Sequence, residues 1–141
     1  MGVGIIIRDE KGNVIAATSE PVMATHDPAT AEAIAALRAV EFCKEVGAFD
    51  INLEGDSLLV VKAICESQTS WLRYGQIIDD IKLVLGSLRS WSIRHIRREA
   101  NVAAHVLAKY AILNFDSHVW LEETPSCILD TVILEQVALS L

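Results

Sequence analysis

Residues 2–18 read GVGIIIRDEKGNVIAAT, and this stretch sets the class of fold. Both of its ends are rich in β-branched residues, and the segment from Asp9 to Asn13, which includes Gly12, has the composition of a tight turn. The pattern predicts a β-hairpin. Because an isolated two-stranded ribbon is marginally stable in water, we expect the hairpin to join a larger sheet or to pack on helices.

The rest of the chain alternates between helical and strand patterns. Asp27 and Pro28 suit the start of a helix and Gly47 suits its end, while Asn101 is a candidate N-cap for a later helix. The further elements predicted are, in order, a strand over 51–55, helices over 58–65 and 73–88, a strand over 91–97, and helices over 102–114 and 128–141. This order predicts an α/β fold, in which a mixed sheet is flanked by helices.

Length and charge bound the organisation of the chain. With 141 residues, of which 52% are hydrophobic, there is material for one core, and we expect one domain over residues 1–115. The formal net charge is −7, and no Lys or Arg follows Lys109. Residues 116–141 are therefore an acidic segment, and an apolar helical stripe makes it a candidate surface for a protein partner. The members of that stripe are Leu129, Val132, Ile133 and Val137.

Membrane, secreted and metal-cysteine proteins do not fit the sequence. The longest uninterrupted apolar stretch, Gly2 to Ile7, is too short to cross a bilayer, and no secretion signal is visible. Ile6 stands where a myristoylation signal has Ser or Thr. We therefore expect a soluble, intracellular protein without a membrane partner, in the nucleus or the cytoplasm. Cys43, Cys65 and Cys127 lack the spacing of metal ligands, and we expect reduced, buried thiols.

Four short motifs, taken together and in order, resemble the ribonuclease H-like family. They are Gly4 to Asp9 with Gly12, Ala31-Glu32-Ala33, Glu54-Gly55-Asp56-Ser57 and Arg98-Glu99-Ala100-Asn101. Trp120 and Pro125 are similar to the plant retroelement-derived, reverse-transcriptase-like branch of that family. The resemblance, which extends from Gly2 to Ile128, implies a sheet with four acidic side chains, two Mg²⁺ ions and endonucleolytic hydrolysis of RNA in RNA:DNA hybrids.

This chemistry requires several carboxylates at one point. Paired cations roughly 4 Å apart stabilise the attacking and leaving oxygens of a phosphodiester, and Mg²⁺ prefers oxygen ligands. By resemblance, Glu32 and Asp56 occupy two of the four acidic positions and are candidate catalytic residues and metal ligands. The family's first acidic residue lies on a strand before the hairpin, which this sequence lacks, and Asp9 is a turn residue instead. The last acidic position is His105, whose neutral imidazole suits Mn²⁺ or Zn²⁺ better than Mg²⁺.

Each of these three residues also has a structural explanation. Glu32 would complement the dipole of a helix if it lay in the first turn, and Asp56 would cap the helix that begins near Ser57. His105 would be a partly exposed histidine on a helix surface, four residues after Asn101. Both interpretations of each residue are open from the sequence.

The basic residues are densest just before Asn101. Arg94, Arg97 and Arg98 form a cluster with His95, and we predict that Arg94, Arg98 and Asn101 contact the phosphates of a nucleic acid. A solvated strand edge, whose charges prevent pairing with another strand, explains the same cluster.

Three functions follow from these residues. In the enzyme hypothesis, Glu32 and Asp56 hold Mg²⁺ or Mn²⁺, and His105 assists as a ligand or in proton transfer. Because two of the four acids are absent, the alternative is a catalytically inactive module that binds nucleic acid, and the third possibility is a protein-interaction module. Trp71, Trp91 and Trp120 are candidate stacking platforms for bases, but Trp91 alternates with Ile93 and we predict that it lies in the core.

Overall fold

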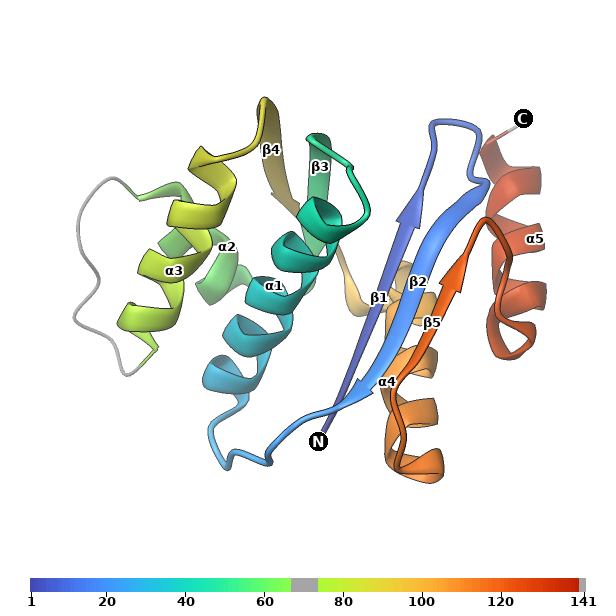
Figure 1. The fold of residues 1–141 in the computed structure, drawn as a ribbon, viewed down its shortest axis with the longest axis horizontal. Coiled ribbons are helices and arrows are strands. Elements are labelled where there is room, and N and C mark those ends of the chain that lie inside the picture. The colour runs from blue at the N-terminus through green and yellow to red at the C-terminus, as the bar shows by residue number, and fades with distance from the viewer. Residues whose placement is uncertain (67–73, 140–141) are drawn as a thin grey trace. The chain divides into compact units, whose positions relative to one another are not determined.

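The computed structural model describes residues 1–66 and 74–139 (Figure 1). The chain forms two compact units, one made of Met1–Met23 with Val102–Leu141 and the other of Ala24–Asn101. Each unit contains a small sheet with helices packed on it. None of the helices within the described ranges has both the length and the apolar character needed to span a bilayer.

The first unit contains the predicted hairpin and a third strand. β1 (Gly2–Arg8) pairs antiparallel with β2 (Val14–Pro21), and β5 (His118–Leu121) pairs antiparallel with the other side of β2, so the strand order is β1-β2-β5. The hairpin is confirmed. The sequence pattern did not predict β5, since four residues are too few to show a period.

Asp9 closes the hairpin turn. Its carboxylate accepts hydrogen bonds from the backbone N–H groups of Lys11 at 2.9 Å and Asn13 at 2.8 Å. The bond from Asn13 is the largest cause that holds the pKa of Asp9 below its usual value. Asp9 therefore stabilises the hairpin turn, as predicted.

α4 (Val102–Asn114) lies directly against β1. A Cβ atom added to Gly4 would be 2.6 Å from the Cβ atom of Leu107 and closer still to backbone atoms of the helix. A Cβ atom added to Gly2 would likewise overlap with the backbone carbonyl of Ala108. Glycine at these two positions is thus a packing requirement, because any side chain would push the helix away from the strand.

The core of the first unit lies between the sheet and the C-terminal helices. Its polar contact is a hydrogen bond of 2.6 Å that the hydroxyl of Ser19 donates to the carbonyl oxygen of Leu107. η2 (Ser126–Ile128) and α5 (Leu129–Leu139) complete this core beside α4 (Figure 1). The buried cluster consists of Ala17, Ala103, Leu107, Ile128 and Val132.

The second unit is a parallel two-stranded sheet with three helices. Its elements are α1 (Pro28–Glu45), β3 (Asp50–Gly55), α2 (Leu58–Cys65), α3 (Gly75–Gly86), β4 (Ser90–His95) and the short η1 (Arg98–Ala100). Asp27 caps α1 through its carboxylate, and Gly47 follows the helix with a φ of 82°, as the sequence predicted. The core is built from the apolar sides of the helices, with Ile51, Leu53 and Ile93 of the strands packed against it.

Two predictions are wrong in detail, and a third falls outside the described residues. Trp91 is not a core residue but is 40% exposed, because it stands near the start of β4, whereas Ile93 is packed against the core. Cys65 and Cys127 are exposed free thiols, and of the three cysteines Cys43 is buried. Trp71 and the predicted helix start at residue 73 lie outside the described residues.

Candidate nucleic-acid and metal site

The carboxyl ends of β3 and β4 lie side by side in the second unit. The two strands run parallel, and their last residues, Gly55 and His95, are paired. Whatever follows each strand therefore emerges at the same edge of the sheet, which is where ligand sites occur in α/β proteins. Asp56 follows β3, while Arg98 and Asn101 follow β4.

Asp56 is the centre of the contacts at this edge. The side-chain amide of Asn101 donates a hydrogen bond of 3.4 Å to Oδ2 of Asp56, and Nε2 of His95 lies 3.2 Å from the backbone oxygen of Asp56. The structure thus brings together a residue predicted to bind metal and one predicted to bind nucleic acid. Asp56 does not cap α2, because the N-cap is Ser57, whose hydroxyl accepts from the N–H of Val60.

His95 was missed as part of this site. Because its sequence neighbours are arginines, the sequence pattern indicates only that His95 belongs to a basic cluster. The signal that could have found it is its position as the last residue of a strand parallel to β3, beside the strand end that carries Asp56.

Glu32 lies on the second turn of α1 and is half-buried. The first turn of this helix, which begins at Pro28, contains no acidic residue. The explanation of Glu32 as a first-turn acid that complements the helix dipole is therefore wrong, because that effect is confined to the first turn. Its role as a metal ligand stays a prediction.

His105 belongs to the first unit, on α4, where it is half-buried. Across residues 1–66 and 74–139, no three His, Cys, Asp or Glu side chains come together as a group that could hold a metal ion. Two dications beside a phosphate need several carboxylates to offset their charge. The donor set that the structure describes does not fit a two-metal centre.

The basic cluster divides into paired and exposed members. Arg94 on β4 forms an ion pair with Glu54 on β3, in which Nε lies 2.6 Å from Oε2. Arg97 and Arg98 lie beyond the strand and are exposed. Since the charge of Arg94 is already compensated by a carboxylate, Arg97 and Arg98 present the stronger positive potential to a phosphate.

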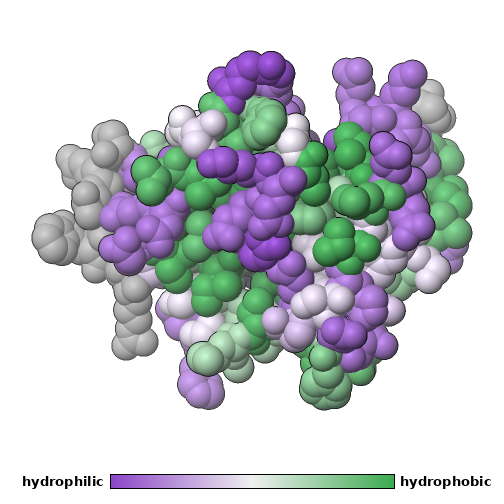
Figure 2. Space-filling model, in the orientation of Figure 1, coloured by the Kyte–Doolittle hydropathy of each residue, from purple (hydrophilic) through white to green (hydrophobic). Residues whose placement is uncertain are grey.

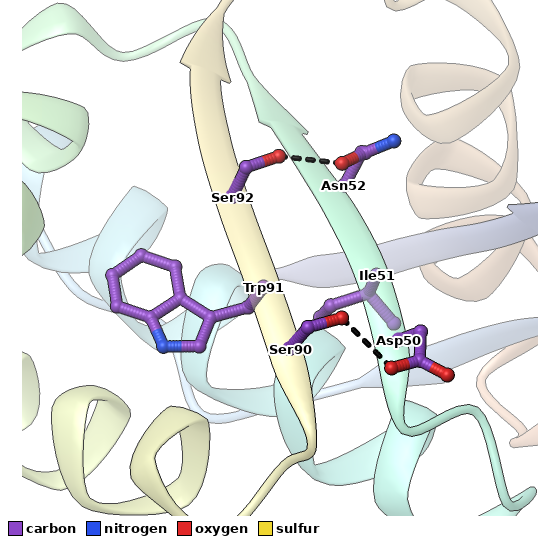
Figure 3. A pocket seen from close by; sticks show the side chains of 6 residues that line it. All are labelled: Asp50, Ile51, Asn52, Ser90, Trp91 and Ser92. Atoms are coloured by element: carbon purple, nitrogen blue, oxygen red, sulfur yellow. Dashed lines mark hydrogen bonds between the residues drawn. The ribbon is translucent and has the colours of Figure 1, made fainter.

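A row of polar cross-strand pairs covers one face of β3 and β4 (Figure 3). Ser90 donates a hydrogen bond of 2.7 Å to Asp50, and Ser92 donates one of 2.5 Å to Asn52. These residues line a shallow depression of about 320 Å³, while the indole of Trp91 points away from the row (Figure 3).

Asp50 is ionised at neutral pH and is already paired. The guanidinium of Arg89, and after it the hydroxyl of Ser90, lower the pKa of Asp50 to about 2. Because this ion pair leaves no excess positive charge at the depression, the depression is a poor site for phosphate. We therefore place the candidate nucleic-acid contacts at the opposite, carboxyl end of the strands.

Comparison with known proteins agrees with the fold and with the motifs. A family model described as reverse transcriptase-like matches residues 1–111. Among solved structures, the chain is similar to RNase H1 from the halophilic archaeon Halobacterium salinarum, with 28% sequence identity and a TM-score of 0.72, over 80% of this chain and 86% of that one. The search among curated proteins gives no match. The predicted ribonuclease H-like α/β fold is confirmed.

Proposed function

Since the chain belongs to the reverse transcriptase-like family, we propose that it is a ribonuclease H-like domain that binds RNA:DNA hybrids and cleaves them poorly or not at all. The observation that carries this proposal is the setting of Asp56. Its carboxylate accepts a hydrogen bond from the side-chain amide of Asn101, and among the described residues it belongs to no group of three His, Cys, Asp or Glu side chains that could hold a metal ion.

The electrostatics of the site disfavour efficient cleavage. Glu32 and Asp56 would hold paired dications, which would supply hydroxide and stabilise the leaving oxygen, but the affinity for such ions depends on the number of carboxylates around them. The amide of Asn101 donates to Oδ2 of Asp56 and so uses one of the acceptor sites of this carboxylate, which leaves fewer of them for cations. With His105 in place of the last acid, we expect any residual cleavage to depend on Mn²⁺ rather than Mg²⁺.

Binding makes smaller demands than cleavage. Phosphate contacts need cations and polar N–H groups on one surface, and Arg97 and Arg98 are exposed in the segment that leads to Asn101. The overall charge of −7 opposes binding, so affinity has to come from this local group. We expect weak, strongly salt-dependent binding.

The test of binding is fluorescence anisotropy of a labelled hybrid at several salt concentrations. Arg98→Ala should weaken binding and flatten its dependence on salt. The matched control is Arg89→Ala, which removes the same charge from the other end of β4, where Asp50 already compensates it. If both variants bind alike, or if the wild-type chain does not bind, the nucleic-acid assignment is wrong.

The test of cleavage is gel analysis of the same hybrid with Mg²⁺ or Mn²⁺, using Asp56→Asn as the control for catalysis. We expect no cleavage in Mg²⁺ above that of the control. Efficient Mg²⁺-dependent cleavage that Asp56→Asn abolishes would show an intact metal centre that requires Asp56, and would overturn the proposal of impairment.

A second candidate function is protein interaction through residues 116–141. It is favoured by one observation, the exposure of most of the apolar stripe of α5. Of the predicted stripe, Val132 is buried, whereas Leu129, Ile133 and Val137 are 45–53% exposed.

A further inference from the structure

One side of α5 is fixed against the first unit. Val132 is 3% exposed in the core, and Glu135 forms an ion pair with Arg8 on β1. Gln136 donates a hydrogen bond of 2.9 Å to Oδ1 of Asn13 in the hairpin turn. These contacts set the rotation of the helix about its axis, so the side chains on its remaining surface have defined directions.

The flank of α5 next to this anchored side is apolar. Leu129, Ile133 and Val137 follow one another at intervals of four residues and so form one stripe, and Leu134 lies beside it. Their exposed fractions are 45%, 47%, 53% and 70%. Hydrophobic residues also gather at the right-hand edge of the space-filling view, where α5 lies (Figure 2). We call these four residues the outer face of α5.

The outer face is set in an acidic part of the chain. Asp130 lies on the helix itself, and Glu122 and Glu123 are exposed shortly before η2. No Lys or Arg follows Lys109 in the sequence. A nucleic acid or an anionic membrane would be repelled here, and a second copy would bring the same sign of charge onto itself.

We infer that the outer face of α5 binds a basic amphipathic helix of another protein. An apolar helical stripe offers ridges that a second helix can pack against, and the exposed Asp130 beside it, in a segment without Lys or Arg, favours a partner whose stripe is flanked by Lys or Arg. The inference rests on the protein-interaction function proposed above and is independent of hybrid binding. An exposed apolar patch on a helix that is held in place is the usual mark of such a surface.

The probe is a fluorescein-labelled peptide of eighteen Leu and Lys residues, roughly two helical turns longer than the outer face, with the leucines on one helical face. Binding to the full chain is measured by anisotropy. Two control peptides share its length: one with the same residues in scrambled order, and one with Glu in place of Lys. We expect the Leu/Lys helix to bind at least tenfold more tightly than either control.

The variant that tests the surface is Ile133→Ser with Leu134→Ser. The two side chains are 47% and 70% exposed, so the fold should survive, which circular dichroism and the melting temperature will check. We expect at least tenfold weaker peptide binding. The matched control is Leu83→Ser on α3, which removes a side chain that is 77% exposed in the other unit and should leave binding unchanged.

Several outcomes overturn the inference. Equal binding by the double variant and by wild type, or equal binding of the Leu/Glu peptide, would remove the surface or its charge preference. A wild-type dimer in sedimentation that the double variant converts to a monomer would assign the face to a second copy. Hybrid binding is measured in parallel, and the double variant should leave it unchanged, so failure of one proposal is distinguishable from failure of the other.

Discussion

Replacing Gly4 by alanine tests how closely α4 lies on β1. The new Cβ atom would be 2.6 Å from the Cβ atom of Leu107 and still closer to the carbonyl oxygen of Ala104 and the backbone nitrogen of Ala108. Carbon atoms in contact are ordinarily about 3.5–4.0 Å apart, so the helix must withdraw by on the order of 1 Å. Backbone atoms cannot rotate away as a flexible side chain can.

The withdrawal loosens the core of the first unit. Leu107 is fully buried and its carbonyl oxygen accepts the hydrogen bond from Ser19, so both the packing and this bond are weakened. Overpacking of this kind typically costs about 1–3 kcal/mol, and contact with backbone places Gly4→Ala at the upper end, about 3 kcal/mol. For a chain of this length that corresponds to a fall in melting temperature of roughly 10 °C.

The assay is thermal unfolding followed by circular dichroism, with Gly86→Ala as the control. Gly86 ends α3, and nothing lies within 4 Å of the position its Cβ atom would take. That substitution should leave the melting temperature unchanged or raise it slightly. If Gly4→Ala has the same melting temperature as wild type, the close approach of α4 to β1 is wrong.

Three further predictions concern single groups in the second unit. Arg89 and Ser90 lower the pKa of Asp50 to about 2, so their contacts with its carboxylate stabilise the fold above about pH 4, and this stabilisation is lost as the pH falls toward 2. In Arg89→Gln the pKa of Asp50, measured by NMR, should return toward 3.8. An unchanged pKa would contradict the assigned cause. Burial raises the pKa of Cys43 to about 11, so a thiol reagent should label Cys43 far more slowly than exposed Cys65. Equal labelling rates of the two thiols in the folded chain would show that Cys43 is accessible. Gly47 has a φ of 82°, and no atom lies within 4 Å of the position that a Cβ atom would take. Gly47→Ala should therefore lower the free energy of unfolding by about 1 kcal/mol through backbone strain alone. An unchanged denaturation midpoint would contradict this backbone conformation.

The candidate site was partly accessible from the sequence. The motifs named Asp56 and Asn101 separately, because each stands in a short recognisable segment. Their hydrogen bond could not be predicted, since they are 45 residues apart and meet only through the parallel register of β3 and β4. The same register places His95 beside Asp56, which no local pattern indicates.

The amino-acid sequence alone determined the local elements. The hairpin, the capped helix α1 and the alternation of helices and strands follow from turn residues, caps and apolar periods, all of which act over a few neighbouring residues. The closeness of α4 to β1 was not foreseen, although the glycines that permit it were visible at positions 2 and 4.

Only the tertiary structure decided which apolar residues are covered. Trp91 fits a core by its spacing with Ile93, yet it is exposed, and within the predicted stripe of α5 Val132 is buried whereas its neighbours are exposed, because burial depends on whether another element packs opposite a residue. The pairing of β5 with β2 was decided in the same way, since a four-residue strand gains its stability from a partner about a hundred residues away.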